Sequence, residues 1–164
     1  MKFATVKEKH EKVVIIGGGE SLRGCSLMDL VDFTGAVITV NNVIFSLPRV
    51  DYWITVDPMD KNGQIQEAMR RRFAKVKYYC AFPDLDKPEN RFDKPFYKTT
   101  RVNYLERIVP KTEAGETYAL QEDKDKITTG DSMYGALGLA YHFEPKAILI
   151  LGLDVYGVGH WYDL

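Results

Sequence analysis

The sequence contains little cysteine, and its two thiols, Cys25 and Cys80, lack the spacing of a metal-binding motif. No disulfide framework is indicated, so a reducing, cytoplasmic location is expected. A run of apolar residues long enough to cross a bilayer is also missing. The first twelve residues are polar and charged, without the apolar stretch of a signal peptide. The sequence therefore predicts a protein without a membrane partner.

An excess of charge of one sign is lacking as well. The 164 residues carry 22 Lys and Arg against 23 Asp and Glu, a formal net charge of −1. Without a positive excess, the chain has no general attraction to nucleic acid. Its basic run, Arg70–Arg72, is interpreted as the solvated face of a helix. What the sequence does have is 45% hydrophobic residues, enough for a single domain over residues 1–164 with a core of its own. The sequence is compatible with both a monomer and a homo-oligomer.

Short apolar segments recur along the chain and alternate with turns and helical patterns. Strands are expected over residues 13–16, 36–40, 52–56, 75–80 and 147–151, and a small-residue helix over 132–143. We expect a solvated leader over 2–12, a short helix or turn over 21–31, and an irregular excursion over 83–126. Continuous apolar strands that alternate with helices are typical of a parallel sheet covered on both faces. The sequence therefore predicts an α/β, Rossmann-like three-layer sandwich with a mainly parallel sheet.

In such a sheet ligands bind beyond the carboxyl ends of the strands, so the residues that follow each strand are the site candidates. Here these residues are Gly17, Gly18, Gly19, Ser21, Asn41, Asn42, Asp57, Thr129, Gly130 and Asp154. Glycine lets a phosphate or sugar approach the backbone, and amide, hydroxyl and N–H groups can hold it. We expect segments 12–60 and 127–164 to meet there and bind a nucleotide or nucleotide sugar. Local turns and helix caps, such as one by Asp131 or Ser132, are the alternative roles.

The residues after the last expected strand are the richest in reactive groups. Tyr156 and Tyr162 can donate hydrogen bonds to phosphate oxygens and so stabilise a departing nucleotide without a metal. His160 is a candidate general base, or else packs against the neighbouring Trp161. Asp57 is a candidate base, ribose ligand or metal ligand, or else a turn former. These side chains are the catalytic candidates.

The order of five motifs resembles a known family. They are Ile-Gly-Gly-Gly-Glu-Ser-Leu at 16–22, Val-Asn-Asn at 40–42, Val-Asp-Pro at 56–58, Thr-Thr-Gly at 128–130 and Gly-Leu-Asp-Val-Tyr at 152–156. This order is similar to that of the small bacterial sialyltransferases. It also resembles the related MptE-like proteins, the 6-hydroxymethylpterin diphosphokinases, and short phage proteins.

The resemblance implies a metal-independent, glycosyltransferase-like protein that binds a CMP-sugar donor, of bacterial or phage origin and acting in the bacterial cytoplasm. In that family the glycine turn, the asparagine and the Thr-Gly loop contact the donor, which places residues 17–21, Asn41 and 129–130 around it. The family's two phosphate-binding tyrosines match Tyr156 and Tyr162, which have the same spacing.

The family's catalytic histidine lies beyond that tyrosine pair, and this sequence ends at Leu164. We therefore expect the fold and a nucleotide pocket to carry over better than sialyl transfer, with Asp57 or His160 as the base if catalysis exists. The MptE-like alternative implies Mg²⁺ held by Asp57 and Asp154. A third alternative is a binding or assembly protein on the same fold without the chemistry.

Overall fold

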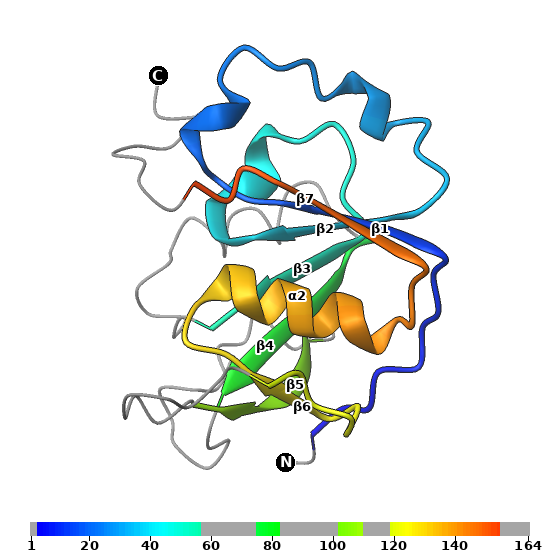
Figure 1. Ribbon diagram of the computed structural model, residues 1–164, viewed down its shortest axis with the longest axis vertical. Coiled ribbons are helices and arrows are strands. Elements are labelled where there is room, and N and C mark those ends of the chain that lie inside the picture. The colour runs from blue at the N-terminus through cyan, green and yellow to red at the C-terminus, as the bar shows by residue number, and fades with distance from the viewer. Residues whose placement is uncertain (1–2, 57–74, 83–101, 110–118, 155–164) are drawn as a thin grey trace.

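The computed structural model describes residues 3–56, 75–82, 102–109 and 119–154, and the seven strands within these residues form one sheet. The strands are β1 (Lys12–Ile16), β2 (Ala36–Val40), β3 (Tyr52–Thr55), β4 (Lys77–Phe82), β5 (Val102–Ile108), β6 (Lys126–Thr128) and β7 (Ala147–Leu151). All pairs are parallel, and the sheet order is β6-β5-β4-β3-β2-β1-β7 (Figure 1). The predicted α/β class with a Rossmann-like parallel sheet is confirmed.

The central strands β1 and β2 are continuous runs of apolar residues because both of their faces are covered. Residues 13–16 of β1 are at most 2% exposed, and all of β2 is buried. A strand in this position needs an apolar side chain at every residue rather than at every second one. Thr39 is the polar exception in β2, and its hydroxyl donates to the carbonyl oxygen of Ile16 at 3.1 Å.

Helix α2 (Ser132–His142) packs across β1, β2, β3 and β6, as its position in front of the sheet in Figure 1 shows. Asp131 caps it, because one carboxylate oxygen accepts from the backbone N–H of Tyr134 at 2.8 Å. The helix expected over 132–143 is confirmed, and of the two expected caps Asp131 is the one used. Within the described residues, no helix is long and apolar enough to cross a bilayer.

The order of the strands reverses between β1 and β7. Strands β2 to β6 follow one another on one side of β1, whereas β7 pairs with its other side, with Val14 opposite Leu149. Such a reversal is where ligands bind in open α/β sheets, at the carboxyl ends of the strands. Although β7 is the most apolar strand, Leu149 is 55% exposed, because β7 is the last strand on this side of the described sheet.

The N-terminal segment differs from the expected solvated leader. Val6 is only 1% exposed, and its N–H donates to the carbonyl oxygen of Lys124 at 2.9 Å. The N–H of Ala4 donates to Tyr104 in β5 at 2.7 Å. The prediction was wrong because this segment packs along the sheet. Val6 stands among charged residues in the sequence, and one apolar residue in such a context does not indicate packing.

Two further segments differ from, or refine, the expectations. The segment 21–31 is a turn rather than an α-helix, with short 3-10 helices η1 (Glu20–Leu22) and η2 (Met28–Leu30), and η3 (Asn41–Ser46) follows β2. The range 83–126, expected to be irregular, contains strand β5. Its sequence, Val-Asn-Tyr-Leu-Glu-Arg-Ile, mixes polar and apolar residues because most of the strand is only half-buried.

Candidate functional site

The carboxyl ends of β1 and β7 are joined by a carboxylate. Both oxygens of Asp154, after β7, accept hydrogen bonds from Ser21, one from its N–H and one from its hydroxyl, each at 2.6 Å. These two bonds lower the pKa of Asp154 below its ordinary range. The predicted meeting of the first turn with the end of the last strand is therefore present in the structure. The contact joins residues 133 positions apart.

The glycine turn packs closely against β7. The N–H of Gly17 donates to Leu151 and that of Gly19 to Gly152, each at 2.8 Å. A Cβ on Gly17 would lie 2.4 Å from the carbonyl oxygen of Gly152, and a Cβ on Gly19 would lie 2.5 Å from Cγ of Asp154. Glycine is required at both positions by the neighbouring strand. Gly18 lies between them in the same turn.

This packing changes the role expected for the first turn. The N–H groups of Gly17, Gly19 and Ser21 already donate within the chain, and the carboxylate of Asp154 lies where an anion would meet the start of η1. A ligand phosphate at this turn would therefore compete with an internal anion. The turn therefore borders the candidate site, but its N–H groups at Gly17, Gly19 and Ser21 are not free to bind a phosphate.

Asn41 connects the ends of β2 and β3 to the start of α2. Its φ of 43° lies in the left-handed region, which asparagine tolerates better than most residues. Its side-chain oxygen accepts from the hydroxyls of Thr55 at 2.8 Å and Ser132 at 3.3 Å, and its backbone oxygen accepts from the indole N–H of Trp53 at 2.9 Å. No described residue accepts from its side-chain NH₂ group, which leaves a donor for a ligand. Asn42 follows it in η3.

The loop between β6 and α2 is held by Arg107 of β5. The guanidinium donates from Nε to the carbonyl oxygen of Thr129 and from Nη2 to that of Gly130, both at 3.1 Å, and from Nη1 to that of Val56 at 3.4 Å. Thr129 is fully buried, and its hydroxyl accepts from the N–H of Asp131 at 3.1 Å. The ends of β3 and β6 are thereby fixed next to each other and to the start of α2.

Arg107 also supplies positive charge. Its three acceptors are neutral carbonyl groups, and no carboxylate in the described part of the chain forms an ion pair with it. Because a guanidinium has five N–H donors, two remain beyond these bonds. Arg107 was not among the site residues predicted from the sequence. The available signal was a cationic side chain near the carboxyl end of a strand, in a segment that was expected to be irregular.

The described candidates lie at one edge of the sheet in two groups. Residues 17–21 bond to Asp154, and Asn41 bonds to Ser132, which follows the loop of Thr129 and Gly130. The four catalytic candidates, Asp57, Tyr156, His160 and Tyr162, lie outside the described residues. Among residues whose positions are described, no three His, Cys, Asp or Glu side chains are grouped as a metal site would require. Both carboxylate oxygens of Asp154, proposed for Mg²⁺ in one alternative, are bonded to Ser21.

Comparison with known proteins gave no match: no family model, curated protein or solved structure is significantly similar to the chain. The resemblance to the sialyltransferases and the MptE-like proteins therefore rests on the order of the five sequence motifs.

Proposed function

We propose that this chain binds a nucleotide, in the form of a nucleotide-sugar donor, at the carboxyl ends of its strands and acts as a glycosyltransferase-like protein. The observation that carries the proposal is the convergence of Asn41, Ser132 and the Arg107-held loop at one edge of the sheet. This edge includes the reversal of strand order, where ligands of open α/β sheets bind.

The charge distribution favours a position for the phosphate. The β6–α2 loop has on one side the guanidinium of Arg107, which pairs with no carboxylate of the described residues, and on the other the N-terminus of an 11-residue helix. Both attract anions, and arginine can bind phosphate oxygens with two parallel N–H donors. The carboxylate of Asp131 is turned to its own helix, since it caps Tyr134. We place the phosphate at this loop, and the sugar or base near the side-chain NH₂ of Asn41.

The chemical step belongs to the same proposal and uses residues beyond the described ones. Tyr156 and Tyr162 would donate hydrogen bonds to the phosphate oxygens as the nucleotide leaves, which stabilises the developing charge without a metal. Asp57 or His160 would accept the proton of the acceptor hydroxyl. In the sequence Asp57 directly follows Val56, whose carbonyl group is held by Arg107.

A nucleotide panel followed by thermal unfolding tests the proposal. CMP, a CMP-sugar, UMP, AMP, ATP and cytidine are compared with and without Mg²⁺. A ligand at about 100 times its Kd adds about 2.7 kcal/mol to the free energy of unfolding, or about 5–10 °C in Tm for a chain of this size. We expect this shift with CMP or a CMP-sugar in EDTA. No shift with any nucleotide would refute the proposal, and a shift with ATP only when Mg²⁺ is present would favour the diphosphotransferase.

The role of the loop is tested with Arg107→Lys, which keeps the charge but loses the planar fork. We expect the affinity for CMP to fall about tenfold, because one charge-assisted hydrogen bond to the phosphate is lost. The affinity for cytidine, which has no phosphate, should stay unchanged. Arg23→Lys is the matched control, because Arg23 is half exposed and pairs only with Glu20 in the described structure. An equal loss for CMP and cytidine would contradict the placement of the phosphate.

A further inference from the structure

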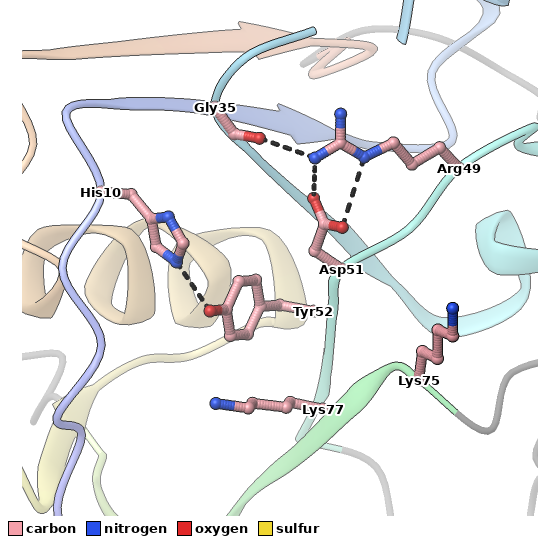
Figure 2. A pocket seen from close by; sticks show the side chains of 7 residues that line it. All are labelled: His10, Gly35, Arg49, Asp51, Tyr52, Lys75 and Lys77. Atoms are coloured by element: carbon pink, nitrogen blue, oxygen red, sulfur yellow. Dashed lines mark hydrogen bonds and ion pairs between the residues drawn. The ribbon is translucent and has the colours of Figure 1, made fainter. Parts of the chain in front are cut away.

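A cavity of about 250 Å³ lies at the edge of the sheet opposite the proposed nucleotide site, where β2, β3 and β4 begin (Figure 2). Its walls come from the N-terminal segment through His10, from the residues before β2 and β3, and from Lys75 and Lys77 at the start of β4. None of the strand-end candidates lines it. The nucleotide site proposed above therefore does not account for this cavity.

One side of the cavity is a closed ion pair. Arg49 donates from Nη2 to one carboxylate oxygen of Asp51 at 2.8 Å and from Nε to the other at 3.3 Å, as Figure 2 shows. The same carboxylate accepts from the N–H of Val37 at 2.9 Å, and Nη2 also donates to Gly35 at 2.9 Å. This unit fastens the starts of β2 and β3 together. Its charges cancel, so Asp51 does not repel an anion as a free carboxylate would.

A second side is formed by two neutral rings. Nε2 of His10 lies 2.6 Å from the hydroxyl oxygen of Tyr52. Burial raises the pKa of Tyr52 to about 12 and lowers that of His10, so both rings are uncharged at neutral pH. A phenol that keeps its proton donates it to Nε2, and the imidazole proton then resides on Nδ1. Figure 2 shows Nδ1 on the side of the ring away from Tyr52, where this N–H is available as a donor.

The two lysines contribute differently. The ammonium of Lys77 pairs with Glu8 and lies 6.0 Å from the centre of the Tyr52 ring, so its charge is largely compensated. Lys75 is exposed, and no described carboxylate pairs with it. The lining thus has one net positive charge, from Lys75, and two unused donors, the ammonium of Lys75 and Nδ1–H of His10.

We propose that this cavity binds a small oxyanion, the phosphate or carboxylate group of a compact molecule. Lys75 provides the charge at one end of the cavity, and the other end has the Nδ1–H of His10 as a donor and the ring of Tyr52 as an apolar surface for the rest of the molecule. Pockets for drug-sized ligands measure about 300–1,000 Å³, so a volume of about 250 Å³ suits a ligand with few atoms beyond the oxyanion rather than a nucleotide.

Nuclear magnetic resonance of the full ¹⁵N-labelled chain tests this proposal. Inorganic phosphate and malonate are each titrated against sodium chloride of equal ionic strength. We expect saturable shifts of the amide signals of residues 35, 49–52 and 75–77 with phosphate, malonate or both, and the tighter ligand identifies the preferred group. Lys75→Gln should weaken this binding about five- to tenfold, the loss of one charge-assisted contact.

Lys126→Gln is the control, since it removes the same charge from a half-buried lysine that lies outside the cavity and pairs with Asp123. It should leave the affinity unchanged. Shifts no larger than those with chloride would overturn the proposal, as would equal affinities of the Lys75→Gln variant and the wild type. So would shifts confined to residues 129–134, because these would report an anion at the opposite edge. That outcome would still leave the nucleotide proposal intact.

Discussion

Gly135 and Gly138 lie one turn apart in α2, yet the same change to alanine should stabilise the fold only at Gly135. A Cβ on Gly135 would find its nearest neighbours, Oγ1 of Thr129 and Cγ1 of Val56, at 3.6 Å, an ordinary van der Waals distance. A Cβ on Gly138 would lie 2.9 Å from Cγ2 of Ile127, closer than such atoms approach. Ile127 is 1% exposed, so it has little room to move.

The magnitudes follow from two terms. Replacing glycine by alanine inside a helix adds about 1 kcal/mol to stability at both positions, because alanine loses less backbone freedom on folding. At Gly138 the forced contact with Ile127 costs about 1–3 kcal/mol, as in other overpacked cores. Gly135→Ala should therefore stabilise the fold by about 1 kcal/mol, whereas Gly138→Ala should be neutral or destabilise it by up to about 2 kcal/mol.

Thermal and urea unfolding of the two variants measure this difference. At about 2–4 °C per kcal/mol for a chain of this length, the Tm of Gly135→Ala should exceed that of Gly138→Ala by about 2–12 °C. In an Ile127→Ala background the close contact is gone, so Gly138→Ala should become stabilising there. The reasoning is refuted if Gly138→Ala matches or exceeds Gly135→Ala in stability, or if the Ile127→Ala background leaves its effect unchanged.

Four other substitutions probe the charges, the core and the sheet edge. The lowered pKa of Asp154 stabilises the folded chain at pH values above 3.8, the ordinary pKa of the group, and this stabilisation is lost as the pH falls through the pKa of the folded state. Asp154→Asn should therefore lower Tm at neutral pH, and its Tm should differ less from that of the wild type in acid. Burial lowers the pKa of His142 below its ordinary value of 6.5, so the unfolded chain takes up this proton first as the pH falls. The free energy of unfolding should therefore decrease as the pH falls below about 6.5, less steeply in His142→Gln. Ile15→Ala, at a fully buried position of β1, should cost about 2–5 kcal/mol, whereas Leu149→Lys on the exposed edge strand should change urea stability by less than about 0.5 kcal/mol.

Much of the sheet could be predicted because its central strands can be recognised from their own residues alone. The runs 13–16 and 36–40 are apolar at every position, which only burial on both faces explains. Helix α2 was equally clear, since Asp131 precedes a run of small residues that ends before Pro145. In these segments the information lies within a few neighbouring residues.

The features that were missed depend on contacts distant in sequence. Strand β5 has polar residues among its apolar ones, and what makes it a strand is pairing with β4 and β6. Val6 is buried because its backbone bonds to Lys124, and Arg107 matters because carbonyl groups 22 and 51 residues away accept its hydrogen bonds. No local pattern carries this information.

The convergence of the strand ends was predictable, but the use of each group was not. Parallel topology alone brings residues 17–21, Asn41, 129–130 and Asp154 to one edge. Which of their donors remain for a ligand depends on internal bonds. The side-chain oxygen of Asn41 is already used by Thr55 and Ser132, so the amide is suited to donating rather than accepting.

The internal bonds also decide between the two glycine-containing loops of the proposed nucleotide site. At the first turn, the donors of Gly17, Gly19 and Ser21 are satisfied within the chain, and Asp154 adds a negative charge. At the second loop, Arg107 adds a positive charge and uses only neutral carbonyl groups as partners there. Each loop has one carboxylate bonded to a backbone N–H, Asp154 at the first and Asp131 at the second, but only the second has an arginine beside it, so the proposal places the phosphate there. The glycines after β1 are therefore best explained by the close approach of β7, and the phosphate of the proposed ligand belongs beside α2.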